Sequence, residues 1–101
     1  MTIELTITAQ GRFDATLDAY NALKMGDVKV TDWPTPTRRG AYKHMQLEIN
    51  DVPPDQVANV GAAVVRVARD TGSGVWMFTY SGNWCFHVSL SFYDAVTEAA
   101  K

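Results

Sequence analysis

The stretch GVWMFTYSGNWCFHVSL, residues 74–90, holds two runs of strand-forming residues on either side of Ser81, Gly82 and Asn83. Valine and aromatic residues favour extended backbone, and a Ser-Gly-Asn sequence is typical of a tight turn. We therefore predict a β-hairpin here. Its turn decides where five aromatic side chains lie, because a slip of one residue moves every side chain to the opposite face.

Two pairings of this hairpin remain open. If Gly82 and Asn83 form a two-residue turn, Tyr80 faces Cys85. One face is then a core face, with Val75, Met77, Thr79, Phe86, Val88 and Leu90. The opposite face contains Trp76, Phe78, Tyr80, Cys85, His87 and Ser89. If the turn has three residues, Tyr80 faces Trp84 instead, and all five aromatic side chains share one face.

Upstream of the hairpin, residues 54–71 show the clearest helical pattern. Apolar side chains recur there at steps of three and four, Pro54 suits the first helical turn, and Gly72 ends the helix. Alternation, spacing and the two prolines of residues 33–40 define the remaining elements. These are strands over 2–8, 27–33 and 41–50, a helix over 13–25, a loop over 33–40 and a short terminal helix over 91–101.

Together these elements predict one α+β domain over residues 1–101. Their order is βαββαβ, with an extra C-terminal hairpin strand and a short terminal helix. This order is typical of a ferredoxin-like fold, in which the helices cover one face of an antiparallel sheet. With the two-residue turn, the helix-free face also carries Tyr42, His44, Gln46 and Glu48.

Composition and charge argue against several classes of protein, among them nucleic-acid-binding domains. The chain is 47% apolar and 20% charged, as globular domains are, and its net charge of −2 lacks the basic excess of nucleic-acid-binding domains. The single cysteine, Cys85, rules out an internal disulfide and a four-cysteine zinc site and favours a reducing compartment. Without a signal-peptide pattern or a long apolar helix, we expect a cytoplasmic protein with no membrane span.

The sequence contains no motif with the spacing of a known catalytic or nucleotide-binding site. The strand over 41–50 also lacks the stacking aromatic residues of an RNA-recognition module. Cys85 and His87 lie two residues apart, and such a pair can form a nucleophile or, with His44, a metal site. A structural histidine and a buried cysteine are the commoner roles of these residue types. We therefore expect no metal, no cofactor and no enzymatic activity.

In length and in its predicted order of elements, the chain resembles the dimeric α/β-barrel proteins. The resemblance implies a dimer that binds a small molecule between sheet and helices, in some members as a cofactor-free monooxygenase. On this alternative, the pocket residues are His44, His87, Cys85 and Trp84. In size, acidity and lack of catalytic motifs, the chain also resembles phage-encoded inhibitors of host defence and bacterial immunity proteins. That resemblance implies the inhibition of a protein partner.

An exposed row of aromatic side chains on a sheet is typical of a partner-binding face or a homodimer interface, unless the terminal helix folds back over it. We predict a small non-enzymatic protein-binding module that inhibits or regulates its partner. The predicted contact residues are Trp76, Phe78, Tyr80, Tyr42, Trp33, Arg38 and Arg39.

Overall fold

The structure is a computed structural model of the whole chain, and it describes residues 3–37, 40–93 and 95, without the side chains of residues 34–37. A helix followed by two strands occurs twice along the chain. The elements are α1 (Ile7–Leu23), β1 (Val28–Thr37), β2 (Gly40–Val52), the 3-10 helix η1 (Pro54–Gln56), α2 (Val57–Thr71), β3 (Gly74–Tyr80) and β4 (Asn83–Phe92).

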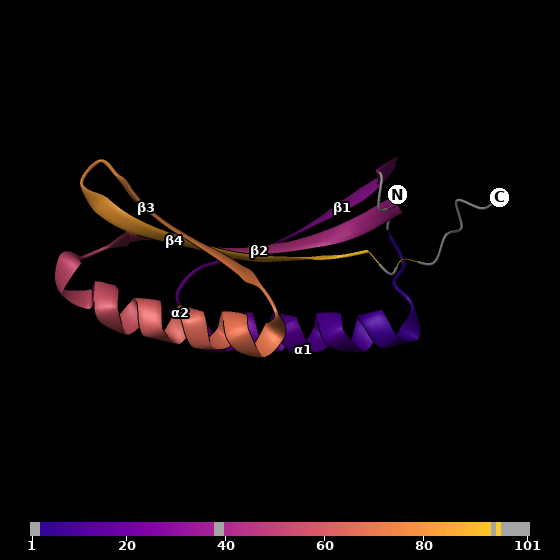
Figure 1. Cartoon of the computed structure of the whole chain (residues 1–101), viewed down its shortest axis with the longest axis horizontal. Helices are drawn as coiled ribbons and strands as arrows, with labels where there is room; N and C mark the ends of the chain where they lie inside the picture. Colours follow the sequence, from indigo (N-terminus) through magenta and orange to yellow (C-terminus); the bar gives the residue numbers. More distant parts are fainter. Residues whose placement is uncertain (1–2, 38–39, 94, 96–101) are drawn as a thin grey trace.

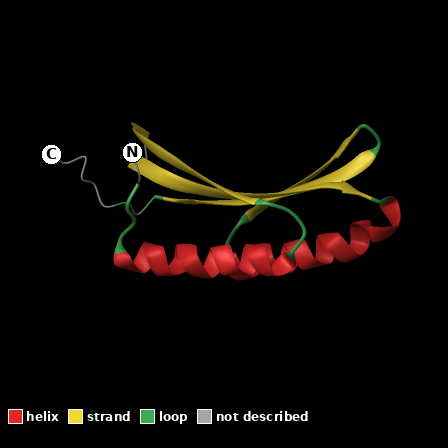
Figure 2. Ribbon diagram, turned by 180° about the vertical axis from the view of Figure 1, so that it is seen from behind, coloured by secondary structure: helices red, strands yellow, loops and turns green. Residues whose placement is uncertain are grey.

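The named strands form an antiparallel sheet in the order β1-β2-β4-β3, with β2 and β4 in the centre. Both helices lie along the same face of this sheet, and no described helix or strand covers the other face (Figures 1 and 2). The predicted α+β class, with helices on one face of an antiparallel sheet, is confirmed. The ferredoxin-like topology is not confirmed, because the described elements run αββαββ.

The strand predicted over residues 2–8 is wrong for the residues that the structure describes. Leu5 makes only an isolated bridge to Ala95, and α1 begins at Ile7. The Thr6 side-chain oxygen accepts a hydrogen bond from the Ala9 N–H at 3.2 Å, so Thr6 caps the helix. The alternating apolar residues Ile3, Leu5 and Ile7 do not share one buried face, as a strand would require. Ile3 and Leu5 are buried in the core, whereas Ile7 is 94% exposed on the helix.

The loop predicted over residues 33–40 is also wrong in its first half, because β1 continues to Thr37. Proline has no N–H to donate to a ladder, so it is tolerated mainly in edge strands. β1 is an edge strand, and its pairing with β2 shifts between Trp33 and Thr37. Pro34 and Pro36 are therefore tolerated within β1, which extends beyond the end at residue 33 that the sequence predicted.

The hairpin of β3 and β4 turns at Ser81 and Gly82, whose φ angles are 51° and 84°. Positive φ at both central residues defines the tight two-residue hairpin turn. Tyr80 pairs with Asn83, so neither predicted pairing is correct. The observed pairing lies two residues from the predicted Gly82-Asn83 pairing, and a shift of two keeps each side chain on its face. The aromatic side chains therefore divide between the faces as that prediction had them.

The terminal helix predicted over residues 91–101 is wrong at its start, because Ser91 and Phe92 belong to β4. Residues 94 and 96–101 lie outside the described residues. The second predicted helix, residues 54–71, is confirmed as η1 followed by α2, and the helix predicted over 13–25 corresponds to α1.

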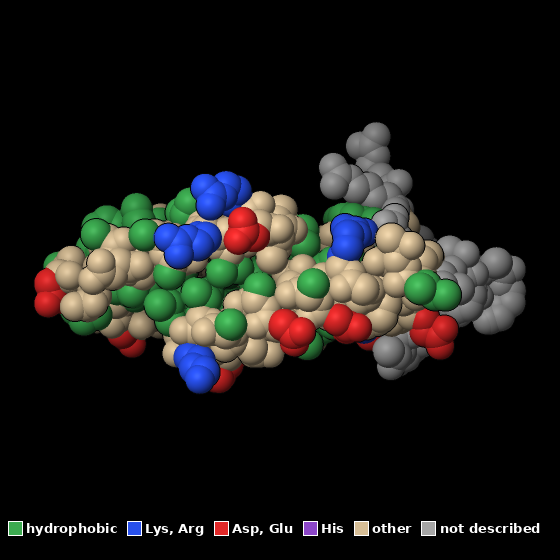
Figure 3. Space-filling view, turned by 90° about the horizontal axis from the view of Figure 1, so that it is seen from below, with side chains coloured by type: hydrophobic (Ala, Val, Ile, Leu, Met, Phe, Trp, Pro, Cys, Tyr) green, Lys and Arg blue, Asp and Glu red, His purple; other side chains and the backbone are tan. Residues whose placement is uncertain are grey.

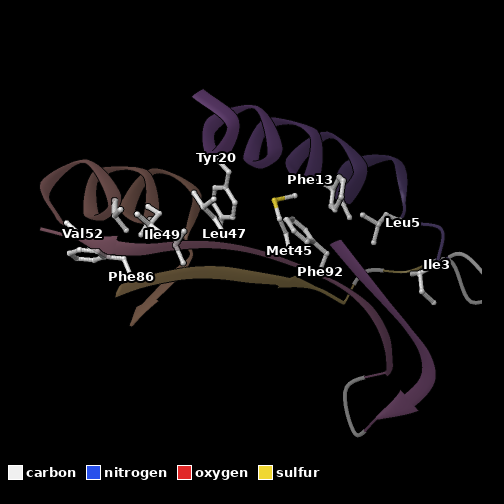
Figure 4. Close-up of a cluster of buried hydrophobic side chains, with 14 residues drawn as sticks. Ile3, Leu5, Phe13, Tyr20, Met45, Leu47, Ile49, Val52, Phe86 and Phe92 are labelled. Carbon is white, nitrogen blue, oxygen red and sulfur yellow. The ribbon is translucent and has the colours of Figure 1, made fainter. Parts of the chain in front are cut away.

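The core lies between the helices and the sheet. Phe13 and Tyr20 of α1 point toward the sheet in Figure 4, and Val64 and Ala68 are the buried positions of α2. The sheet contributes alternate residues of its central strands, namely Met45, Leu47, Ile49, Phe86, Val88 and Phe92. This alternation packs one face of the sheet against the helices, and the opposite face lies outside that core.

Two partly buried polar groups connect separate parts of the chain. The Tyr20 hydroxyl shares a 2.6 Å hydrogen bond with the Ser73 hydroxyl, and burial raises the pKa of Tyr20. The Asp32 carboxylate accepts bonds from the Ile3 N–H at 3.0 Å and from Lys43 Nζ at 2.8 Å. Burial alone raises the pKa of Asp32, but these two bonds and the attraction of nearby positive charge, Lys43 above all, together outweigh it and lower that pKa below 3.8.

The helix side of the molecule has a mixed surface, with acidic and basic side chains among apolar ones (Figure 3). Ile7 and Val65 are exposed apolar residues of the two helices. In the part of the chain that the structure describes, neither helix is long and apolar enough to span a membrane.

Candidate functional site

The face of the sheet opposite the helices, which we call the outer face, carries most of the predicted site residues that lie in the four named strands. Paired residues share a face, and the alternate set is buried under the helices, so strand register assigns each side chain. The outer face contains Lys29, Thr31, Trp33, Tyr42, His44, Gln46, Glu48, Trp76, Phe78, Tyr80, Cys85, His87, Ser89 and Ser91.

Three exposed aromatic side chains lie along β3 at one end of the outer face. Trp76 is 58% exposed, Phe78 39% and Tyr80 71%, and we call them the hairpin cluster. Their spacing of two residues puts them on one side of the strand. The Phe78 ring meets His87 edge-on, with 4.9 Å between ring centroids. Exposed aromatic groups of this kind are typical of binding surfaces.

A hollow of about 300 Å³ opens beside the hairpin cluster, lined by Asn50, Asp51, Phe78, Tyr80 and Cys85. It lies where the pairing of β2 with β4 is interrupted, and Asp51 has a positive φ of 58° there. Such bulges commonly re-aim side chains beside functional sites. The Asp51 carboxylate accepts a 3.2 Å hydrogen bond from Asn83. Aromatic walls and one carboxylate suit a partner side chain with an apolar body and a donor at its tip.

A second aromatic group occupies the opposite end of the outer face. Trp33 stacks on Tyr42 with ring centroids 6.0 Å apart, and Tyr42 contacts Tyr93 at 4.8 Å. The stretch of β2 from Tyr42 to Asn50 spans roughly 25 Å at the rise of a strand. A single small partner segment would therefore contact one aromatic group and not both.

Polar side chains occupy the outer face between the two aromatic groups. His44 Nδ1 shares a 2.8 Å hydrogen bond with Ser91 Oγ, and Gln46 donates to Glu48 at 2.8 Å. Lys29 Nζ lies 3.9 Å from the same Glu48 carboxylate. The His44–Ser91 and Lys29–Glu48 contacts tie neighbouring strands together, whereas the Gln46–Glu48 bond lies within β2. Over the residues that the structure describes, no three His, Cys, Asp or Glu side chains are placed to hold a metal ion.

The predicted contact residues thus fall into two groups. Trp76, Phe78 and Tyr80 lie together, whereas Trp33 and Tyr42 stack at the far end of the sheet. Arg38 and Arg39 lie outside the described residues.

The residues of the alternative pocket are not brought together between sheet and helices. His44, Cys85 and His87 lie on the outer face, while Trp84 lies on the helix side and packs against the core. Cys85 is 4% exposed beneath the hairpin cluster. A hollow of about 170 Å³ on the helix side is lined by Arg12, Ala15, Thr16, Asp70, Thr71 and Leu90, none of which belongs to that predicted pocket.

Sequence reasoning missed Asn50 and Asp51, which line the larger hollow, and Met77, which was assigned to the core. Met77 does point to the helix side but is 54% exposed, because the turn end of the hairpin curves away from the helices (Figure 1). The Asn-Asp pair that precedes Val-Pro-Pro was an available signal for an irregular strand end. The curvature of the hairpin, which exposes Met77, has no comparable signal in the sequence.

Comparison of the chain with protein-family models, with curated proteins and with solved structures gives no significant match.

Proposed function

We propose that the protein is a non-enzymatic binding module that holds a protein partner with its hairpin cluster and thereby inhibits or regulates that partner. The observation that supports this proposal is the exposure of Trp76, Phe78 and Tyr80 side by side on the helix-free face. The adjoining hollow offers a place for one partner side chain. This function agrees with the resemblance in size and acidity to phage anti-defence and bacterial immunity proteins, and with a cytoplasmic setting that keeps Cys85 a thiol.

Trp76 and Tyr80 are the expected anchors of the interface. Tryptophan and tyrosine carry much of the binding energy of protein interfaces, because they bury a large area with few rotatable bonds. Replacing a true anchor with alanine costs about 2 kcal/mol or more, which weakens affinity roughly 30-fold. Both residues are more than half exposed, so their removal should leave the fold intact.

The test is capture of a partner from a lysate of the source cells by the immobilised protein. We compare wild type with the double variant Trp76→Ala, Tyr80→Ala. The matched control is Ile7→Ala, Val65→Ala, which also removes two exposed apolar side chains but from the helix side. Circular dichroism and urea denaturation verify that each variant is folded.

We expect one protein or complex to bind to wild type and to the helix-side control but not to the hairpin-cluster variant. Retention of the same proteins by all three would contradict the proposal. So would equal loss from both double variants.

The small-molecule alternative has less support. Its expected pocket residues are split between the two faces of the sheet, with His44 and His87 on the outer face and Trp84 on the helix side. The hollow where α1 and α2 meet is small, at about 170 Å³, and has no histidine in its lining. Ligand pockets are typically about 300 to 1,000 Å³.

A further inference from the structure

β3 presents an unusual sheet edge. Among the described strands it pairs only with β4, and its sequence, GVWMFTY, contains neither a charge nor a proline. Apolar side chains are exposed on both sides of it, with Trp76, Phe78 and Tyr80 on the outer face and Met77 on the helix side. A free edge of this kind is a template for pairing with another strand.

The other edge strand, β1, has the features that prevent such pairing. Pro34 and Pro36 remove two N–H donors from it, and Lys29 and Asp32 add charges. Only the edge at β1 is therefore protected against pairing with another strand. The edge at β3 is open to such pairing.

We propose that β3 pairs with β3 of a second copy of this chain, antiparallel across a two-fold axis, to give one continuous eight-stranded sheet. This proposal does not rest on partner binding by the hairpin cluster, because strands pair in the plane of the sheet and leave the outer face open.

Backbone geometry restricts the register of this pairing. Tyr80 and Asn83 flank the two-residue turn and exchange hydrogen bonds, so the alternation of an antiparallel ladder directs the N–H and C=O groups of Val75, Met77 and Thr79 away from β4. When the two-fold axis passes midway between the two copies of Met77, the N–H and C=O groups of these three residues form hydrogen bonds with those of the same three residues in the second copy. Met77 then faces Met77 of the partner subunit.

Side chains in this register are complementary to one another. Trp76 lies opposite Phe78 of the partner subunit, and aromatic cross-strand pairs stabilise sheets. Gly74 lies opposite the partner subunit's Tyr80, and the Trp76 ring of the same strand lies against Gly74, so the Tyr80 ring meets an aromatic ring there. Since β3 has no charged residue, the paired strands place no like charges opposite each other.

The available area favours a weak dimer. From the exposed fractions of Trp76, Met77, Phe78 and Tyr80, each copy offers roughly 450 Å² of side chain. Pairing in the plane of the sheet covers only part of these side chains, so two copies bury less than roughly 900 Å² of side chain, short of the 1,000 Å² or so of small specific interfaces. We expect a dimer that dissociates in the micromolar range.

The test is sedimentation velocity over a range of micromolar concentrations, with a pair of charge variants. Met77→Lys places two lysines opposite each other across the axis, and Met77→Glu places two glutamates there, so each variant alone should be monomeric. An equimolar mixture places lysine opposite glutamate and should restore the dimer. The control, Val30→Lys, puts the same charge on an exposed apolar position of β1, 43% exposed, and should dimerise as wild type does.

Restoration of the dimer by the mixture excludes misfolding as the reason for the two monomers. A wild type that stays monomeric throughout overturns the proposal, as does a Met77→Lys variant that dimerises like wild type. A monomeric wild type whose captured partner is lost on Met77→Lys assigns the edge to a foreign strand and also overturns it. A monomeric wild type that retains its partner through Trp76 and Tyr80 overturns only the dimer, while a dimer without a captured partner contradicts only the proposed function.

Discussion

Asp32 connects the N-terminal segment to the sheet, and its replacement by asparagine should destabilise the protein measurably. The carboxylate accepts hydrogen bonds from the Ile3 N–H and from Lys43 Nζ. Asparagine can still accept the backbone bond but loses the attraction to the lysine ammonium. The Lys43 side chain is 12% exposed and that of Asp32 22%, so water replaces the lost partner poorly.

The magnitude follows from these exposures. A hydrogen bond to a charged group contributes about 1.5 to 3 kcal/mol, whereas a fully exposed ion pair contributes about 0 to 1 kcal/mol. For this largely covered pair we expect Asp32→Asn to lower the free energy of unfolding by about 2 kcal/mol at pH 7. Asp18→Asn is the control, because it removes the same charge from an exposed position of α1.

The pH dependence of this loss provides a second check. The pKa of Asp32 is lowered in the folded chain, so an unfolded chain takes up the proton first as the pH falls. The stabilisation by Asp32 is therefore complete above the ordinary pKa of 3.8 and is lost as the pH falls through the lower folded value. Urea denaturation of both variants from neutral to acid pH measures this. Equal stability of Asp32→Asn and Asp18→Asn at pH 7 would refute the reasoning.

Two further predictions concern packing and a buried hydroxyl. Gly26→Ala should lower the melting temperature and cost about 2 kcal/mol, because a Cβ there would lie 2.3 Å from the Glu48 carbonyl oxygen. Gly11→Ala, in open space on α1, should instead raise the free energy of unfolding by up to about 1 kcal/mol. If both glycine variants changed that free energy in the same direction, the packing argument would be contradicted. Tyr20→Phe should cost about 1 kcal/mol by removing the bond to Ser73. Because the pKa of Tyr20 is raised, wild type should lose stability as the pH rises above 10 while Tyr20→Phe loses less, as measured by alkaline urea denaturation.

The fold class could be predicted from the sequence because the strongest patterns agreed with the tertiary structure. The helix over residues 54–71 has both a long apolar stripe and a terminal glycine, and the alternation of β2 buries Met45, Leu47 and Ile49. The N-terminal segment misled because alternation over a few residues does not show what lies opposite. Thr6 was the missed signal, since its side chain starts a helix whose buried face begins at the small Ala9.

The candidate face could be predicted only in part. Ser-Gly and Gly-Asn both suit a tight turn, so the sequence alone did not select Ser81 and Gly82. The choice mattered less than expected, because the two turns differ in pairing by two residues and keep Trp76, Phe78 and Tyr80 on the outer face. The hollow at Asp51 depends on an interrupted ladder between two strands, and a single strand's sequence does not define that interruption.

The two prolines of β1 have a consequence for the size of any assembly. A sheet that could be extended at both margins would add copy after copy and grow into a filament. Here the margin at β1 contains Pro34 and Pro36, which have no N–H to donate, so a copy joined through β3 would offer a second margin less suited to pairing. Growth beyond one joining step would therefore be disfavoured, although β3 is an uncharged, aromatic strand at the surface.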